Sequence, residues 1–102
     1  MTRLANSTID VLHNAAASRF EAVVDGHLCV ANYHLVDGVV RIHHTAVPRA
    51  VAGRGIAATL VQAALDYAAA NDLEVEPWCS YVRSYMKRHP ATQALLPGGF
   101  RL

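Results

Sequence analysis

The chain has 102 residues, of which 53% are hydrophobic and 17% are charged, and its formal net charge is +1. This length predicts one domain, and the hydrophobic fraction is high enough for a buried core. The small net charge argues against a nucleic-acid-binding protein that relies on a broad basic surface. Cys29 and Cys79 are too few for a disulfide framework or a cysteine zinc cluster, and we expect no metal. Because no apolar run resembles a signal peptide or a membrane span, we expect a cytoplasmic protein.

The first 18 residues have the least regular pattern. Residues 9–13 are compatible with a short strand or with a single helical turn, and residues 14–18 read as a connector. We therefore expect residues 1–18 to form an irregular N-terminal segment or a short strand. The main domain is expected over residues 19–96, with a C-terminal tail at 97–102.

Three consecutive strands are predicted over residues 19–24, 27–36 and 39–47. Their apolar residues tend to alternate with polar ones, and the third is rich in β-branched residues. Asp25-Gly26 and Asp37-Gly38 separate them, and these pairs suit two-residue hairpin turns, which need positive φ at both positions. Pro48 ends the third strand. Two hairpins in succession predict an antiparallel meander.

A long helix is predicted over residues 54–71. Its polar residues form one narrow stripe, so that most of its surface must be buried against the sheet. The short strand that follows, residues 73–77, should lie parallel to strand 39–47, because a strand–helix–strand unit normally returns in that direction. A second helix is expected over residues 80–88, with Ser80 as its N-cap.

The junction between the third strand and the long helix is the most informative segment. Here Gly53-Arg54-Gly55 opens directly onto the helix. Backbone N–H groups from Ala52 to Ala57 should point to the mouth of this loop, where the helix dipole favours negative charge. Such a loop can hold a phosphate or a diphosphate. The motif alone is weak, because a Gly-x-Gly turn also occurs merely as the start of a helix, and it lacks the longer dinucleotide and triphosphate patterns.

Five short motifs, taken together, resemble the minimal single-domain members of the GCN5-related N-acetyltransferases. In chain order they are Arg19-Phe20-Glu21, His44-Thr45-Ala46-Val47-Pro48, Gly53-Arg54-Gly55-Ile56, Pro77-Trp78-Cys79-Ser80-Tyr81-Val82 and Arg88-His89-Pro90. The resemblance covers about residues 19–96 and implies an α+β fold: a three-stranded antiparallel meander, a helix, a parallel strand and a second helix. The wider superfamily usually has Gln or Arg at the position of Ala50, and Arg49 is the candidate substitute.

The same resemblance implies acetyl-CoA as the co-substrate. Its diphosphate would lie on the glycine loop, and its pantetheine arm between strands 39–47 and 73–77. Tyr85 and Arg88 are candidates for contact with the adenine and the ribose phosphate, although the arginines are equally explained as solvated charges and the tyrosine as core packing. The residues expected to bind coenzyme A are Ala46, Val47, Arg49, Ala52, Gly53, Arg54, Gly55, Ile56, Ala57, Tyr85 and Arg88.

His44 and Cys79 are the candidate catalytic residues. At the start of a helix the thiolate of Cys79 is favoured, which suits a nucleophile, but a pocket-lining or merely buried thiol is equally compatible. Strand alternation predicts that His43 and His44 face opposite sides of the sheet, so that they cannot share a metal. His44 is the candidate general base, against the alternative of a hydrogen-bonded core histidine. Trp78 either walls the acyl pocket or simply packs.

The expected function is therefore an acetyl-CoA-binding N-acetyltransferase that acts on an amine, either a protein lysine or a small amine. The alternative is a non-catalytic coenzyme A-binding or interaction module. We expect acetyl-CoA and an amine acceptor as partners, and neither nucleic acid nor a membrane.

Overall fold

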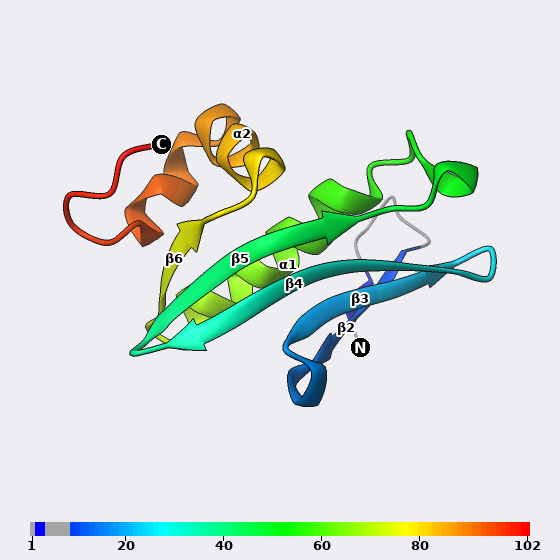
Figure 1. Cartoon of the computed structure of the whole chain (residues 1–102), viewed down its shortest axis with the longest axis horizontal. Coiled ribbons are helices and arrows are strands. Elements are labelled where there is room, and N and C mark those ends of the chain that lie inside the picture. The colour runs from blue at the N-terminus through cyan, green and yellow to red at the C-terminus, as the bar shows by residue number, and fades with distance from the viewer. Residues whose placement is uncertain (1, 4–8) are drawn as a thin grey trace.

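The computed structural model describes residues 2–3 and 9–102. Its strands form one six-stranded sheet in the order β1-β2-β3-β4-β5-β6 (Figure 1). All neighbouring strands are antiparallel except β5 and β6, which are parallel. The strands are β1 (Thr2–Arg3), β2 (Asp10–Asn14), β3 (Arg19–Val24), β4 (His27–Val36), β5 (Val39–Ala46) and β6 (Glu74–Pro77). The predicted α+β fold, with its meander and its parallel strand, is confirmed.

The N-terminal segment extends the meander. β2 pairs with β3, from Leu12 opposite Glu21 to Asn14 opposite Arg19, and the short 3-10 helix η1 (Ala15–Ala17) joins the two strands. Of the two alternatives for residues 9–13, the strand is therefore correct. The rest of the predicted irregular segment, residues 1 and 4–8, lies outside the described residues.

The two Asp-Gly pairs form the tight turns of the meander. Asp25 and Gly26 have φ values of 49° and 78°, and Asp37 and Gly38 have values of 51° and 78°. Two successive residues with positive φ match the right-handed twist of hairpin strands. The turns thereby set the register in which β3, β4 and β5 pair.

β5 contains a bulge that the sequence pattern did not predict. Asn32 of β4 pairs with His44, whereas its neighbour Tyr33 pairs with Ile42, so that His43 is an extra residue on β5. A bulge of this kind breaks the two-residue period of a strand. The alternation of faces predicted along β5 therefore fails at His43.

The bulge places both histidines on the same face of the sheet. Tyr33 is buried, so its neighbours Asn32 and His34 must lie on the opposite face. His44 pairs with Asn32, and the ring of His43 lies 4.3 Å from that of His34, measured between centroids. Both His43 and His44 are exposed. The prediction that they face opposite sides of the sheet is wrong.

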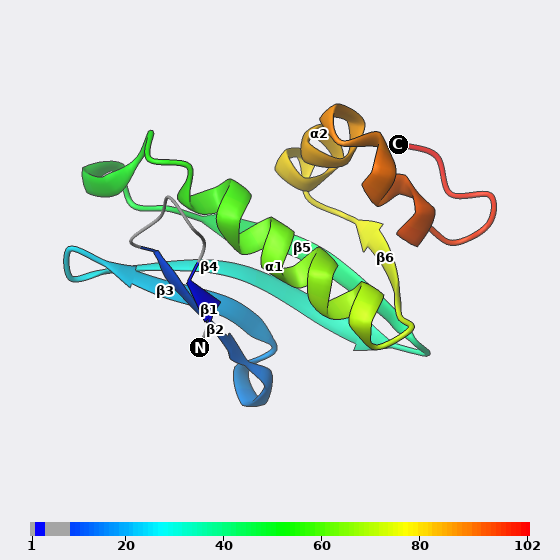
Figure 2. The ribbon, with the colours of Figure 1, turned by 180° about the vertical axis from the view of Figure 1, so that it is seen from behind.

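The helix α1 (Ile56–Ala70) lies across the other face of the sheet, over its central strands (Figure 2). The predicted wide apolar surface is confirmed, because the residues buried on α1 are Ile56, Leu60, Val61, Ala64, Leu65 and Ala68. They pack on the inward residues of the strands, including Phe20, Cys29, Tyr33 and Val40. We call the sheet face opposite α1 the outer face. Leu12, Val23 and Leu28 lie exposed on it.

The C-terminal part of the chain extends one edge of the sheet. β6 pairs with β5 from Glu74 opposite Val39 to Pro77 opposite Ile42, and α2 (Ser80–Arg88) and the 3-10 helix η3 (Pro90–Leu95) follow it. Cys79 is the N-cap of α2, so the prediction of Ser80 at that position is wrong. Among the described residues, the helices are too short or too polar to cross a bilayer.

Candidate functional site

β5 and β6 separate beyond a short parallel ladder. The last backbone hydrogen bond between them in the described chain runs from the N–H of Trp78 to the carbonyl of Ile42, at 2.9 Å. β5 continues to Ala46, whereas the chain after Trp78 turns away into α2 (Figure 1). The backbones of β5 and of the β6–α2 connection therefore diverge, and we call the region between these two backbones the strand gap. Its closed end lies at Trp78.

The glycine loop lies at the open end of the strand gap. β5 leads through Pro48 and the 3-10 helix η2 (Arg49–Val51) to the N-terminus of α1. Gly53 and Gly55 have φ values of 81° and 75°, and Gly55 is the N-cap of α1. Val51 is buried and anchors the loop, whereas residues 52–55 are exposed. Positive φ explains why glycine occupies both positions.

Six consecutive backbone N–H groups of this loop, those of residues 53–58, have no hydrogen-bond acceptor within the described part of the chain. Three of these donors belong to the first turn of α1, which has 15 residues. Orphan N–H groups and the helix dipole together attract an anion at such a position. The Cβ of an added side chain at Gly53 or Gly55 would meet no protein atom within 4 Å, so the space above the loop is free for a ligand.

The two arginines of the loop differ in their contacts. Arg54 donates from Nη1 to Oδ2 of Asp25 in the β3–β4 turn, at 2.6 Å, and both side chains are largely exposed. Arg49 lies exposed in η2 and contacts no acidic side chain of the described residues within ion-pair distance. Arg49 is therefore free to meet an anion at the loop, whereas Arg54 must leave Asp25 to do so.

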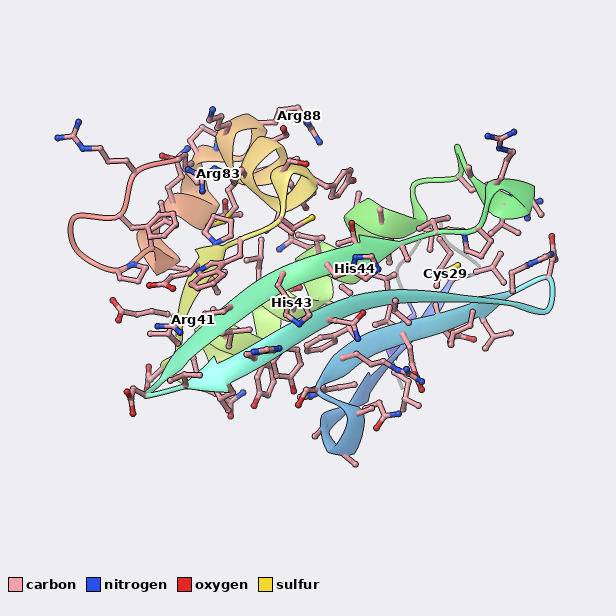
Figure 3. All side chains as sticks on the ribbon, viewed as in Figure 1. Cys29, Arg41, His43, His44, Arg83 and Arg88 are labelled. Atoms are coloured by element: carbon pink, nitrogen blue, oxygen red, sulfur yellow. The ribbon has the colours of Figure 1, made fainter. Side chains whose placement is uncertain are left out.

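The two predicted catalytic residues lie on different elements and do not touch. The Sγ atom of Cys79 is 3.7 Å from Oγ1 of Thr45 on β5, so these two side chains face each other across the strand gap. His44 lies on the outer face, where Figure 3 shows its ring beside β5. No hydrogen bond joins His44 to Cys79 among the described residues. Deprotonation of Cys79 by His44 thus finds no support in this geometry.

His43 lies beside His44 on the outer face (Figure 3). Partial burial, followed by the nearby His34 and His44, lowers the pKa of His43 below its ordinary value. The imidazole is therefore kept neutral over a wider pH range than in a free histidine. A neutral imidazole on the open face is able to accept a proton.

Tyr85 and Arg88 occupy different environments on α2. Only 5% of Tyr85 is exposed, its hydroxyl donates to Oε1 of Gln62 on α1, and its ring stacks on His89 with 4.1 Å between centroids. Burial is the main cause that raises the pKa of Tyr85. The tyrosine thus joins α2 to α1 and offers little surface to an adenine. Arg88 is exposed in the last turn of α2 (Figure 3).

Two features of this site were not found from the sequence. Asp25 was assigned only a turn, because its partner Arg54 is 29 residues away. The sequence places Thr45 in a strand and in the second of the five motifs but gives it no side-chain partner, because its contact with Cys79 depends on the parallel return of β6. The bulge at His43 likewise has no local signal such as a glycine. The described residues contain no group of three or more His, Cys, Asp or Glu side chains arranged to hold a metal ion.

The fold and these motifs have counterparts in known proteins. Over 93 residues the chain is 36% identical to Protein NATD1 of Xenopus tropicalis, covering 88% of this chain and 85% of that protein. It is 44% identical to human Protein NATD1 over 57 residues, and there the match spans only about half of each protein. A solution structure of a GCN5-like protein from Staphylococcus aureus has the same fold, with a TM-score of 0.71, 22% identity and coverage of 93% of this chain and 94% of that one.

Residues 19–95 match the family described as GCN5-related N-acetyl-transferase, which is most of the chain and includes the strand gap and the glycine loop. The resemblance of the five motifs is thereby confirmed. This chain belongs to the GCN5-related N-acetyltransferase family.

Proposed function

We propose that this protein transfers an acetyl group from acetyl-CoA to an amine. The observation that carries the proposal is the row of six N–H groups at residues 53–58 that find no acceptor among the described residues, at the open end of the strand gap. A diphosphate suits this row, because each phosphate oxygen accepts several hydrogen bonds and the α1 dipole favours its charge. Membership of an acetyltransferase family supports the same conclusion.

The proposed binding mode uses the loop and the gap together. The diphosphate lies on the N–H groups of the glycine loop, and Arg49 supplies a charge-assisted contact. The pantetheine arm runs along the strand gap beside Ala46 and Val47, so that the thioester lies toward the closed end at Trp78. Arg88 is the proposed contact for the ribose phosphate, whereas the buried ring of Tyr85 is not part of the proposed site.

The proposed transfer is a direct displacement. The amine nitrogen attacks the thioester carbonyl, the new C–N bond forms, and the C–S bond breaks as the coenzyme A thiolate leaves. The proton of the amine passes to a base, for which His44 on the outer face is our candidate. The N–H of Val47 has no acceptor among the described residues, and it is the candidate donor to the oxyanion of the tetrahedral intermediate.

The direct test compares coenzyme A with pantetheine by titration calorimetry. Pantetheine lacks the diphosphate, so we expect it to bind at least about tenfold more weakly. At a hundred times its dissociation constant, coenzyme A should also raise the free energy of unfolding by about 2.7 kcal/mol. Equal binding of the two compounds would remove the loop from the proposal. Binding of acetyl-CoA without transfer to any amine would favour the non-catalytic module instead.

Gly55→Ala is the matching variant, with Gly99→Ala as its control. Both glycines have positive φ, 75° and 84°, and at neither would the new Cβ meet a protein atom within 4 Å. Each substitution should therefore cost about 1 kcal/mol of stability through backbone strain. Only Gly55→Ala places a methyl group between the N–H donors and a phosphate, so only this variant should weaken coenzyme A binding.

A further inference from the structure

A hollow of about 520 Å³ lies on the outer face beside the closed end of the strand gap. β5, β6, α2 and the C-terminal loop contribute to its wall. Figure 3 shows Arg41 on β5 and Arg83 on α2 at this end of the molecule. The residues that line the hollow are Arg41, Glu76, Trp78, Arg83 and Phe100.

In one half of this lining, the charges of Arg41 and Glu76 cancel in an ion pair that Trp78 joins. Arg41 donates from Nε to Oε1 of Glu76 at 3.0 Å, and the indole N–H of Trp78 donates to the same oxygen at 2.9 Å. The guanidinium of Arg41 also lies over the indole ring, 5.1 Å from its centroid. These contacts leave the Nη atoms of Arg41 without an acceptor among the described residues. They also fix the indole, of which 59% is exposed, as one wall of the hollow.

The other half carries a positive charge that is not balanced. Arg83 donates to two neutral backbone carbonyls, that of Pro77 at 3.3 Å and that of Arg101 at 2.9 Å, and its guanidinium lies over the ring of Phe100. No carboxylate of the described residues forms an ion pair with Arg83. Since Glu76 balances Arg41, the five lining residues keep one net positive charge. A polycationic amine is disfavoured there, and an anionic group is favoured.

The hollow also has the right position for a reaction partner. The backbone of Trp78 closes the strand gap through its hydrogen bond to Ile42, and its side chain walls the hollow. A thioester at the closed end of the gap would therefore be next to whatever the hollow holds. His43 and His44 lie on the same face of β5, a few residues beyond Arg41.

We propose that this hollow binds the acceptor, and that the acceptor carries a carboxylate near its amine, as a free amino acid does. This inference rests on the proposed transfer of an acetyl group to an amine. The carboxylate meets the unpaired Nη atoms of Arg41 and lies near the unbalanced charge of Arg83, and an apolar side chain lies against Trp78 and Phe100. The amine then points toward the strand gap.

The test uses L-phenylalanine and L-phenylalaninamide as probes, which differ in the carboxylate. We expect the protein to bind L-phenylalanine at least about tenfold more tightly than L-phenylalaninamide, because hydrogen bonds to charged groups are the stronger ones. Calorimetry with and without coenzyme A measures this preference independently of any transfer. Equal affinity for the two probes, or no binding of either, overturns the inference.

Arg83→Gln should abolish the preference and Arg83→Lys should restore part of it. Arg101→Gln is the matched control, because it removes a neighbouring charge but keeps the backbone carbonyl that Arg83 contacts. Arg41→Gln provides a second variant if Arg83→Gln does not fold. If the unchanged protein prefers L-phenylalanine but does not bind coenzyme A, the result counts against the proposed function and not against the hollow. If Arg83→Gln and Arg41→Gln both keep the preference for L-phenylalanine over L-phenylalaninamide, the result counts against the hollow.

Discussion

Arg54 of the glycine loop and Asp25 of the β3–β4 turn form an ion pair, with 2.6 Å between Nη1 and Oδ2. The pair joins the proposed diphosphate loop to the tip of a hairpin that is distant in sequence. Because a diphosphate would attract the same guanidinium, we infer that Asp25 competes with the proposed ligand for Arg54. On this proposal the ion pair sets part of the affinity of the loop.

We expect Asp25→Asn to tighten coenzyme A binding by about two- to fivefold, the range of an exposed ion pair. Asparagine tolerates the φ of 49° at this position, so the hairpin should persist. Asp37→Asn is the matched control, since Asp37 has the same turn and the same conformation but does not contact Arg54. Weaker binding by Asp25→Asn in calorimetry would mean that Asp25 holds Arg54 in position for the ligand.

His44→Gln should reduce kcat by about a hundredfold at neutral pH, because a positioned general base contributes that order of acceleration. The KM for acetyl-CoA should change little, since His44 lies on the outer face and not in the glycine loop. The measurement is the pH dependence of kcat, which should lose its ascending limb. His43→Gln is the control at the same bulge. If His43→Gln alone loses the ascending limb of kcat, the general base is His43. If the pH profiles of both variants are unchanged, neither histidine is the general base.

Cys79→Ala should retain at least about a tenth of the transfer rate. The polar contact of Sγ in the described structure is the hydroxyl of Thr45, which is no base at neutral pH. We therefore expect no acetyl adduct on Cys79 when the protein is incubated with acetyl-CoA and its intact mass is measured. Cys29→Ala controls for the buried thiol of β4. An acetyl adduct together with loss of transfer in Cys79→Ala would establish a covalent intermediate.

The stability of the protein should fall as the pH decreases below about 6.5, the pKa of an unperturbed histidine. His13 stacks on Phe20, with 4.2 Å between ring centroids, and burial lowers its pKa. The unfolded chain then binds a proton more readily than the folded one, so acid favours unfolding; above this pH the histidine contributes no pH dependence.

The measurement is urea unfolding between pH 8 and pH 5. His13→Phe should show a shallower fall of the free energy of unfolding, and His27→Phe on β4 is the control. The fall should not vanish in His13→Phe, because the pKa of His43 is lowered as well. A fall as steep as that of the unchanged protein would mean that folding does not change the pKa of His13.

Elements with strong local signals were predicted well from the sequence. The Asp-Gly pairs gave the hairpins, the apolar surface of residues 56–68 gave the buried helix, and the crossover rule gave the direction of β6. These predictions succeed because turn geometry and helical periodicity depend on residues close together in the chain. Ser80 failed as N-cap, because Cys79 took the extended backbone of that position.

The glycine loop could likewise be predicted, since positive φ and a helix start are local properties of Gly53 and Gly55. The bulge at His43 could not be predicted from the sequence, because it depends on how β4 pairs with β5. The partners of Arg54 and Arg41 lie 29 and 35 residues away, so only the assembled sheet brings them together. Local sequence thus determines the hairpin turns, the helices and the glycine loop, whereas tertiary contacts decide which charges stay unpaired and which histidines share a face.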